Sequence, residues 1–175
     1  MEFQVLGFAP DGPTLDLDWR AFSYAGKFVM SNTGKAVLRD GEIVAAASFN
    51  ADRQTEDRAW IRYLTVREDR RGEGLGPKLA RSVIERLRER GYATVRMAVN
   101  NPVAYRAGYR AGFSFTGEET GLAELVLEYP GEADEAAYLA GLDRFAGRDL
   151  PSGQAELLER WRVAGHPPEP VNGTP

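Results

Sequence analysis

The sequence contains no cysteine and only one histidine, His166, among its 175 residues. The lack of cysteine excludes a disulfide framework, a zinc–cysteine site, an iron–sulfur cluster and a cysteine nucleophile. A single histidine leaves almost nothing with which to build a serine–histidine triad or a multi-histidine metal site. We therefore expect any chemistry to depend on the backbone, carboxylates, tyrosines or a bound cosubstrate, without a metal.

The chain also lacks long apolar runs and an excess of positive charge. No apolar stretch reaches the roughly 18–20 residues of a membrane span, and the first residues do not show the basic and apolar regions of a secretory signal. The 22 basic and 26 acidic side chains give a net charge of −4, so the whole surface is not a nucleic-acid footprint. We expect a cytoplasmic protein with no nucleic-acid or membrane partner.

Hydrophobic residues make up 43% of the chain, which suffices for a core in a chain of about one domain. Apolar periodicity and turn residues predict strands at 3–8, 35–40, 43–50, 59–66, 94–99, 113–115 and 123–129. The same signals predict helices at 14–28, 77–90, 101–111, 132–145 and 154–163. A strand–helix–strand unit implies a parallel pair, and the hairpin at Gly41 adds antiparallel strands. The expected fold class is therefore mixed α+β.

The composition changes after Pro130, because residues 118–159 carry 11 acidic and 2 basic side chains. We expect residues 1–130 to form the main domain, residues 131–165 a helical extension packed on it, and residues 166–175 a disordered tail. Two interpretations of the acidic extension stay open. It steers a cationic acceptor, or it serves solubility, packing or a homodimer contact.

The most informative segment is the glycine-rich loop Arg70–Gly76, between the strand at 59–66 and the helix at 77–90. Glycine tolerates a positive φ and lets a ligand approach the backbone closely. Successive amides and the positive end of a helix attract an anion. The loop therefore predicts a phosphate or pyrophosphate site, although its G-x-G-x-G spacing fits neither a Walker loop nor the dinucleotide fingerprint. A surface turn with incidental glycines is the alternative.

Two motifs at matching separation resemble the GNAT superfamily of N-acetyltransferases. Residues 64–66 end a strand, and Arg71, Gly74 and Gly76 then fit the family's acetyl-CoA motif, Gln/Arg-x-x-Gly-x-Gly/Ala. Downstream, the segment Asn101–Phe113 resembles the family's Asn…Ala…Gly-Phe segment. The C-terminal extension lies outside the resemblance.

The resemblance implies a twisted, mostly antiparallel sheet with a splayed central parallel strand pair, flanked by helices. It also implies transfer of an acetyl group from acetyl-CoA, as cosubstrate, to a primary amine of a small molecule or peptide by direct attack in a ternary complex. No metal takes part. The residues that the resemblance assigns to acetyl-CoA binding are Leu64, Thr65, Val66, Arg71, Gly72, Glu73, Gly74, Leu75, Gly76, Lys78, Asn101 and Ala104.

The chain departs from the family pattern at the position of the tyrosine that protonates the leaving thiolate, which here is Gly108. Tyr105, three residues earlier on the same helix face, is the candidate substitute for this general acid, and Tyr109 is a second candidate. Packing is the alternative role for Tyr105, and water is the alternative acid. A second departure is Pro77, which removes an amide directly after the glycine loop.

A third departure is that the strand at 59–66 carries no glutamate to act as general base. Tyr63 lies on it, but a phenol is a poor base at neutral pH. Glu118, Glu119, Glu124 or a chain of waters are the alternatives, and each carboxylate is more often a solvated surface charge. The general base is therefore left open.

Three aromatic residues, Trp19, Phe22 and Tyr24, lie in the segment that lines the acceptor side in GNAT folds. Core packing is the favoured interpretation, and contact with the acceptor is the alternative. The missing acid and base also motivate a second function, a catalytically weak acyl-CoA-binding sensor or partner subunit. A third interpretation is an RNA- or protein-associated domain with an unrelated glycine loop, which predicts salt-dependent binding to nucleic acid.

Overall fold

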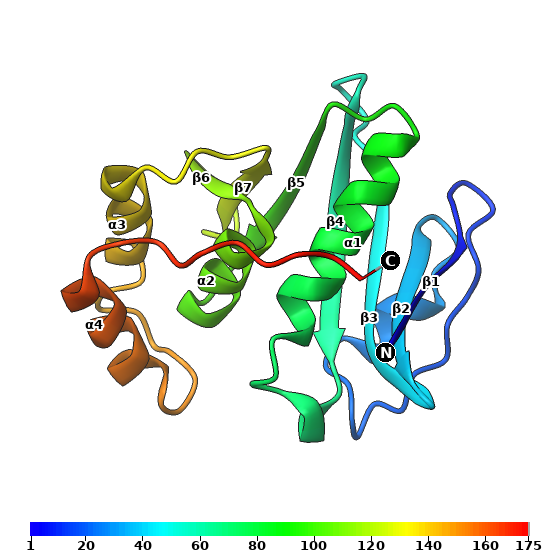
Figure 1. Cartoon of the computed structure of the whole chain (residues 1–175), viewed down its shortest axis with the longest axis horizontal. Coiled ribbons are helices and arrows are strands. Elements are labelled where there is room, and N and C mark those ends of the chain that lie inside the picture. Colours follow the sequence, from blue (N-terminus) through cyan, green and yellow to red (C-terminus); the bar gives the residue numbers. More distant parts are fainter. Residues whose placement is uncertain (175) are drawn as a thin grey trace. The chain divides into compact units, whose positions relative to one another are not determined.

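Residues 1–174, described by a computed structural model, form seven strands, four α-helices and two short 3-10 helices (Figure 1). The strands follow the order β1-β2-β3-β4-β5-β7-β6 and are antiparallel except for one parallel pair. The predicted mixed α+β class is confirmed. The chain divides into two compact units. The first unit consists of Met1–Val95 together with the C-terminal end from Asn172, and the second consists of Arg96–Val171.

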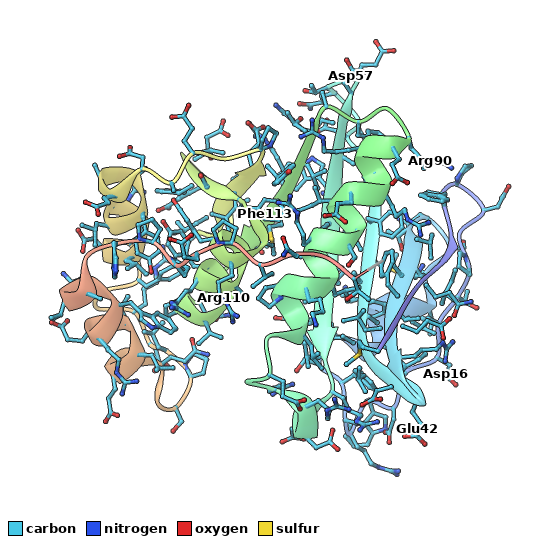
Figure 2. All side chains as sticks on the ribbon, viewed as in Figure 1. Asp16, Glu42, Asp57, Arg90, Arg110 and Phe113 are labelled. Carbon is cyan, nitrogen blue, oxygen red and sulfur yellow. The ribbon has the colours of Figure 1, made fainter. Side chains whose placement is uncertain are left out.

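The sheet of the first unit contains four antiparallel strands, β1 (Glu2–Gly7), β2 (Gly34–Asp40), β3 (Glu42–Ala51) and β4 (Arg58–Val66). Gly41 makes the predicted β2–β3 hairpin turn with a φ of 74°, a backbone conformation that favours glycine. The first four predicted strands are confirmed to within one or two residues. In Figure 2, Glu42 marks the end of the sheet at which β4 terminates, and Asp57 marks the opposite end.

Helix α1 (Leu75–Glu89) covers one face of this sheet, over β3 and β4 (Figure 1). The helix starts two residues before Pro77, where the sequence predicts its first position. Pro77 still falls in the first turn, where its missing N–H breaks no helical hydrogen bond. The buried side chains repeat at helical spacing, and they include Leu75, Leu79, Ala80, Val83, Ile84 and Leu87. Full burial of one such leucine or isoleucine contributes about 1.5–3 kcal/mol.

The segment 14–28 is not the amphipathic helix that the sequence predicts. It runs as an irregular loop and forms only a short 3-10 helix, η1 (Ala25–Val29), which follows Tyr24 in a left-handed conformation. A backbone hydrogen bond of 2.8 Å from the Leu15 amide to the Phe28 carbonyl folds the segment back on itself. Local backbone hydrogen bonds occur only in short turns, such as that from the Phe22 amide to the Asp18 carbonyl at 2.9 Å.

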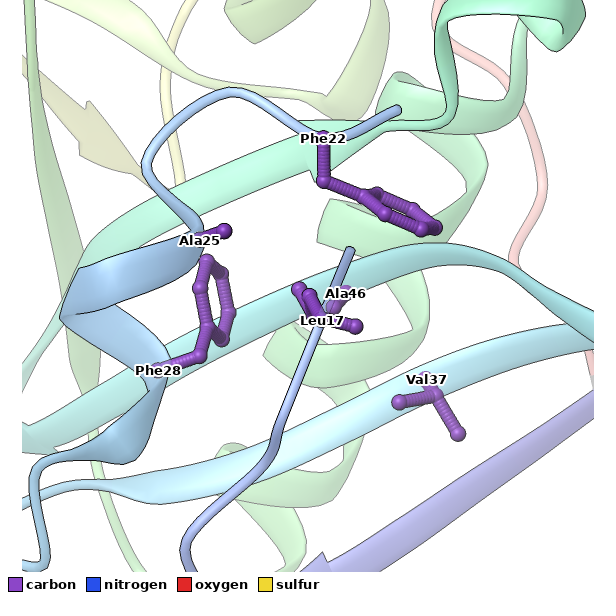
Figure 3. Close-up of a cluster of buried hydrophobic side chains, with 6 residues drawn as sticks. All are labelled: Leu17, Phe22, Ala25, Phe28, Val37 and Ala46. Carbon is purple, nitrogen blue, oxygen red and sulfur yellow. The ribbon is translucent and has the colours of Figure 1, made fainter. Parts of the chain in front are cut away.

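The apolar side chains of this loop nevertheless reach the sheet. They form a buried cluster with β2 and β3, which consists of Leu17, Phe22, Ala25, Phe28, Val37 and Ala46 (Figure 3). The spacing of these residues in the sequence therefore correctly indicated that their side chains are buried. It was wrong in predicting that they lie on a helix. An irregular loop and a helix can bury the same side chains, and the tertiary contacts decide between them.

The second unit holds most of β5 (Thr94–Val99) and then five elements, α2 (Pro102–Ala111), β6 (Ser114–Glu119), β7 (Leu125–Tyr129), α3 (Glu135–Asp143) and α4 (Gln154–Ala164). All six predicted elements are confirmed, and β6 is longer than predicted. Helix α2 packs on β7 and α4, and α3 packs on β6 and α4. Gly112, with a φ of 102°, ends α2.

The C-terminal segment 166–174 forms neither helix nor strand. Within the second unit, the amide of Val171 donates to the carbonyl of Arg110 at 2.6 Å. Within the first unit, the amide of Thr174 donates to Ser82 Oγ of α1 at 2.7 Å. The disorder of this tail, and the domain boundary at residue 130, stay predictions. Pro175 lies outside the described residues.

Candidate acetyl-CoA site

The candidate site begins where β4 ends at Val66. The chain continues through the 3-10 helix η2 (Glu68–Arg70) and the glycine loop into α1. The predicted residues Leu64–Val66 pair with Ala45–Ala47 of β3, so one edge of β4 is already occupied. The buried hydroxyl of Thr65 has no hydrogen-bond partner among residues 1–174. An unpaired buried hydroxyl costs stability, so it marks this end of β4 for a further polar contact.

Arg70 does not supply the free positive charge that its position in the loop suggests. Its Nε donates to Glu73 Oε2 at 2.8 Å, and its Nη1 donates to Asp40 Oδ2 at 3.1 Å. The carboxylate of Glu73 is therefore engaged, which leaves its backbone amide for a ligand. Arg67 is held in the same way by two carboxylates.

Arg71 is the loop arginine that has no carboxylate partner within residues 1–174. Its Nη2 donates to Ser23 Oγ at 3.0 Å, and its Nε lies 3.4 Å from the carbonyl oxygen of Val66. Both acceptors are neutral, so the guanidinium retains its full charge beside the loop. The arginine of the predicted motif is thus the one that can attract a phosphate.

The backbone of the loop offers unpaired amides. Gly72 and Gly74 have φ values of 84° and 78°, and Gly74 caps α1 in the left-handed conformation. The amides of Leu75 and Gly76 have no acceptor within residues 1–174, whereas the amide of Lys78 donates to the Gly74 carbonyl at 3.3 Å. No acidic side chain lies in the first turn of α1. The helix N-terminus is therefore positive and open to an anion.

Two further predicted residues lie at the start of α2, in the second unit. Asn101 is the N-cap of this helix, and its Oδ1 accepts a hydrogen bond from the Ala104 amide at 2.9 Å. Its Nδ2 donates to Asn100 Oδ1 at 3.0 Å. Asn101 thus caps α2, and this role is independent of any contact that its side chain makes with a ligand.

The two candidate acids are buried inside the second unit. Tyr105 is 0% exposed, and its hydroxyl donates to the carbonyl of Tyr138 on α3 at 2.9 Å. The hydroxyl of Tyr109 accepts from the Phe115 amide at 3.0 Å. Burial raises the pKa of Tyr105 far above its usual range and also raises the pKa of Tyr109. This geometry favours packing for Tyr105, the alternative that the sequence left open.

Gly108, which the resemblance aligns with the family's tyrosine, has little free space beside it. A side chain on Gly108 would run into Cδ1 of Leu127, on β7, because α2 lies directly against that strand. Met97 Sδ would lie 3.8 Å from the same Cβ. A tyrosine at this position would therefore require the end of the Leu127 side chain to move.

The three candidate bases all have partners within the second unit. Glu118 pairs with Arg96 at 2.9 Å, and Glu119 pairs with Arg144 at 2.6 Å. Glu124 accepts from the hydroxyl of Thr120 at 3.1 Å. These contacts distinguish none of the three as a base, so the assignment stays open.

The aromatic residues of the loop 14–30 have different environments. Phe22 is buried in the core, as the favoured interpretation predicts. Trp19 is 75% exposed, and Tyr24 is half-exposed with its ring 5.5 Å from that of Tyr63. Core packing is wrong for Trp19 and Tyr24, and contact with an acceptor stays open for both.

The part of the chain that the structure describes contains neither a cluster of metal ligands nor a helix that could span a membrane. No group of three histidine, cysteine, aspartate or glutamate side chains in residues 1–174 is arranged to hold a metal ion. In the same residues, no helix is both long enough and apolar enough to cross a bilayer.

Residues 4–113, more than half of the chain, match the family model of the acetyltransferase (GNAT) family. The chain belongs to this family, and its class is that of the acyltransferase enzymes. No curated protein matches the sequence significantly.

Solved structures confirm the GNAT-like fold. An acetyltransferase from Bacillus subtilis, in complex with CoA, is 13% identical with a TM-score of 0.55, and the match covers 72% of this chain and 95% of that chain. A protein described as a GNAT-family acetyltransferase from Desulfovibrio desulfuricans is 18% identical with a TM-score of 0.50, over 55% of this chain and 67% of that chain. Across four matched structures, this chain covers 58% to 67% of the neighbour's length. The activities and substrates of these neighbours can therefore only be proposed for this chain.

Proposed function

We propose that this chain transfers an acetyl group from acetyl-CoA to a primary amine, which belongs to a small molecule or to a peptide. Membership of the GNAT family supports the class of reaction. The observation that carries the acetyl-CoA site is the loop after β4, where Arg71 has no carboxylate partner and two amides at the start of α1 have no acceptor.

In this proposal the pyrophosphate of acetyl-CoA binds the amides of Arg71–Gly76 and the guanidinium of Arg71. Residues 64–66 of β4 contact the pantetheine arm, with Lys78, Asn101 and Ala104 as further contacts. Charge-assisted hydrogen bonds from arginine to phosphate are stronger than neutral ones, which favours Arg71 over the paired Arg70.

The proposed reaction is a direct attack in a ternary complex. The neutral amine nitrogen forms a bond to the thioester carbonyl carbon, and the C–S bond then breaks. The amine proton passes to a base or to solvent, and the CoA thiolate takes up a proton. Because Tyr105 and Tyr109 are buried and hydrogen-bonded, we propose that water protonates the thiolate. A thiolate is a fair leaving group, so this step does not need a strong acid.

The test is thermal unfolding of the protein with and without acetyl-CoA. At about a hundredfold excess over the dissociation constant, binding stabilises a protein by about 2.7 kcal/mol. For a chain of this size this corresponds to a rise in Tm of about 5–10 °C. Release of free thiol in the presence of a panel of amines then measures the transfer itself.

A variant pair localises the ligand. Gly74→Asp places bulk and negative charge at the N-cap of α1 and should abolish the shift in Tm with acetyl-CoA. Gly153→Asp is the matched control, since Gly153 is the N-cap of α4 and has a φ of 80°, against 78° for Gly74. Normal acetyl-CoA binding by Gly74→Asp would show that the loop is not the site.

A second candidate function is a sensor or partner subunit that binds acyl-CoA and catalyses poorly. The observation that favours it is the glycine at position 108, with Leu127 in the space beside it, together with the absence of a carboxylate on β4. This alternative predicts the same shift in Tm with no thiol release for any amine tested. The proposal also includes a cytoplasmic location and a homodimer. Sedimentation of the purified chain tests whether it forms a homodimer.

A further inference from the structure

A groove in the second unit has no role in the proposed acetyl transfer. It lies between α2, α4 and the first residues of the C-terminal segment, and its volume is about 480 Å³. Pockets that bind small ligands have volumes of roughly 300–1,000 Å³, so the groove is large enough for one. Trp161, Pro167 and Pro168 give it apolar walls.

The charged side chains of the groove are two arginines and one carboxylate. Arg106 and Arg110 are four residues apart on α2, so they lie on one face of the helix. Neither forms an ion pair within residues 1–174, and the carboxylate of Glu169 at the groove is not within salt-bridge distance of either. Two like charges one helical turn apart destabilise a helix unless an anion lies between them. The lining therefore carries a net positive charge in a chain whose net charge is −4.

The aromatic side chains orient the first of these arginines. The guanidinium carbon of Arg106 lies 5.1 Å from the centre of the Trp161 ring, a cation–π distance. Burial raises the pKa of the Tyr138 hydroxyl, and the hydrogen bond and charge of Arg106 oppose that rise. Arg106 is thus held by the ring of Trp161 and the hydroxyl of Tyr138.

The backbone of Arg110 holds the outer wall in place. Its carbonyl accepts the hydrogen bond from the Val171 amide at 2.6 Å, which keeps the C-terminal segment beside α2. Figure 2 shows Arg110 next to this segment. The guanidinium of Arg110 has no hydrogen-bond partner within residues 1–174, so its donors are available to a ligand.

We propose that this groove binds a small organic anion in which a carboxylate or a phosphate is joined to a planar ring. The guanidinium of Arg110 matches the two oxygens of such a group in a fork-like pair of hydrogen bonds. The ring packs between Trp161 and the two prolines. This second ligand site lies entirely within the second unit, whereas the acetyl-CoA loop belongs to the first.

The test is a calorimetric and fluorescence titration of the full chain with two probes, AMP for the phosphate and benzoate for the carboxylate. We expect saturable binding of at least one probe, and the probe that binds identifies the anionic group. Inorganic phosphate, which has no ring, should bind more weakly than AMP. In Trp161→Phe the fluorescence response should disappear while the heat of binding persists, since the ring is retained.

Arg110→Gln should weaken binding by about tenfold or more, since a charged hydrogen-bonded pair is lost. The matched control is Arg160→Gln, which removes the same charge from an exposed position of α4 outside the groove and should change affinity by less than about twofold. Arg110→Lys keeps the charge, loses the planar fork and should bind at an intermediate level. Circular dichroism verifies that each variant is folded.

Three results would overturn the proposal. The first is that neither probe binds at millimolar concentration. The second is equal weakening by Arg110→Gln and Arg160→Gln, which would indicate a general effect of charge. The third is AMP binding that is lost in Gly74→Asp and kept in Arg110→Gln, which would place AMP at the loop after β4.

Discussion

The hydroxyl of Tyr105 on α2 lies directly over Gly141 on α3, where a methyl group would overlap the tyrosine ring. The same hydroxyl donates to the carbonyl of Tyr138, one helical turn earlier. The ring also contacts Phe145 and Tyr109, at centroid distances of 5.7 Å and 5.1 Å. Tyr105 thus fixes α3 against α2, which gives this phenol a structural role independent of any chemistry.

Tyr105→Phe should therefore affect stability and not the transfer rate. Loss of a buried hydrogen bond costs about 0.5–1.5 kcal/mol, and the Tyr138 carbonyl is left without this donor. Urea unfolding measures the change in free energy, and thiol release measures the rate. Tyr109→Phe is the control for removal of a neighbouring buried hydroxyl. A fall in rate for Tyr105→Phe alone, with an unchanged fold, would establish Tyr105 as the general acid.

Gly141→Ala should destabilise the protein although alanine is the better helix former. The added methyl group meets the Tyr105 ring and forces the two helices apart, at a cost of about 1–3 kcal/mol. Gly26→Ala is the control, because a Cβ there has nothing within 4 Å. Equal midpoints of thermal unfolding for the two variants would mean that Tyr105 moves aside without cost.

Asn101 allows capping and ligand binding to be measured separately. Asn101→Ala removes the side-chain acceptor of the Ala104 amide, and loss of an N-cap costs about 1 kcal/mol. Asn101→Asp keeps the capping oxygen and brings a negative charge close to the proposed cosubstrate. We expect Asn101→Ala to lower stability and Asn101→Asp to retain it, while both weaken acetyl-CoA binding in calorimetry. Unchanged affinity in both variants would limit Asn101 to its role as a cap.

Acid should remove the stabilisation that Asp52 provides. A hydrogen bond from Trp60 and two from backbone amides lower the pKa of Asp52 to about 2. Since the folded pKa is below the unfolded value of about 3.9, the stabilisation is complete above that value and is lost as the pH falls toward 2. The difference in unfolding free energy between wild type and Asp52→Asn should therefore shrink between about pH 4 and pH 2.

Asp16→Asn is the control for this pH series. Asp16 lies on the exposed loop (Figure 2) and makes no hydrogen bond or ion pair within residues 1–174. The difference in unfolding free energy between Asp16→Asn and wild type should be small. A difference for Asp52→Asn that does not vary with pH would show that the hydrogen bonds of Asp52 do not favour its charged form.

Local signals in the sequence predicted most of the elements. Alternating apolar residues and Gly41 placed the β2–β3 hairpin, because a strand pattern and a turn glycine are properties of neighbouring residues. The same holds for α2, which Asn101 begins and Gly112 ends. The glycine loop could also be recognised from neighbouring residues alone, because three glycines between a strand and a helix have few structural explanations.

The predictions from the sequence failed where contacts between residues distant in the chain determine the local structure. The segment 14–28 has helical spacing, but a backbone hydrogen bond joins Leu15 to Phe28 and its apolar side chains pack on the sheet. The motif singled out Arg71, but the charge pairing of Arg70 could not be predicted from the sequence. Asp40, thirty residues from Arg70 in the chain, neutralises one of them and leaves the other charged.

The sequence by itself determined the family, the loop that is the candidate acetyl-CoA site, and the absence of a tyrosine at position 108. Only the tertiary structure decided what became of that position. Leu127 fills the space beside Gly108, and Gly141 leaves the notch that holds Tyr105. Both depend on which side chains face each other across elements that are distant in sequence, and no local pattern records such contacts.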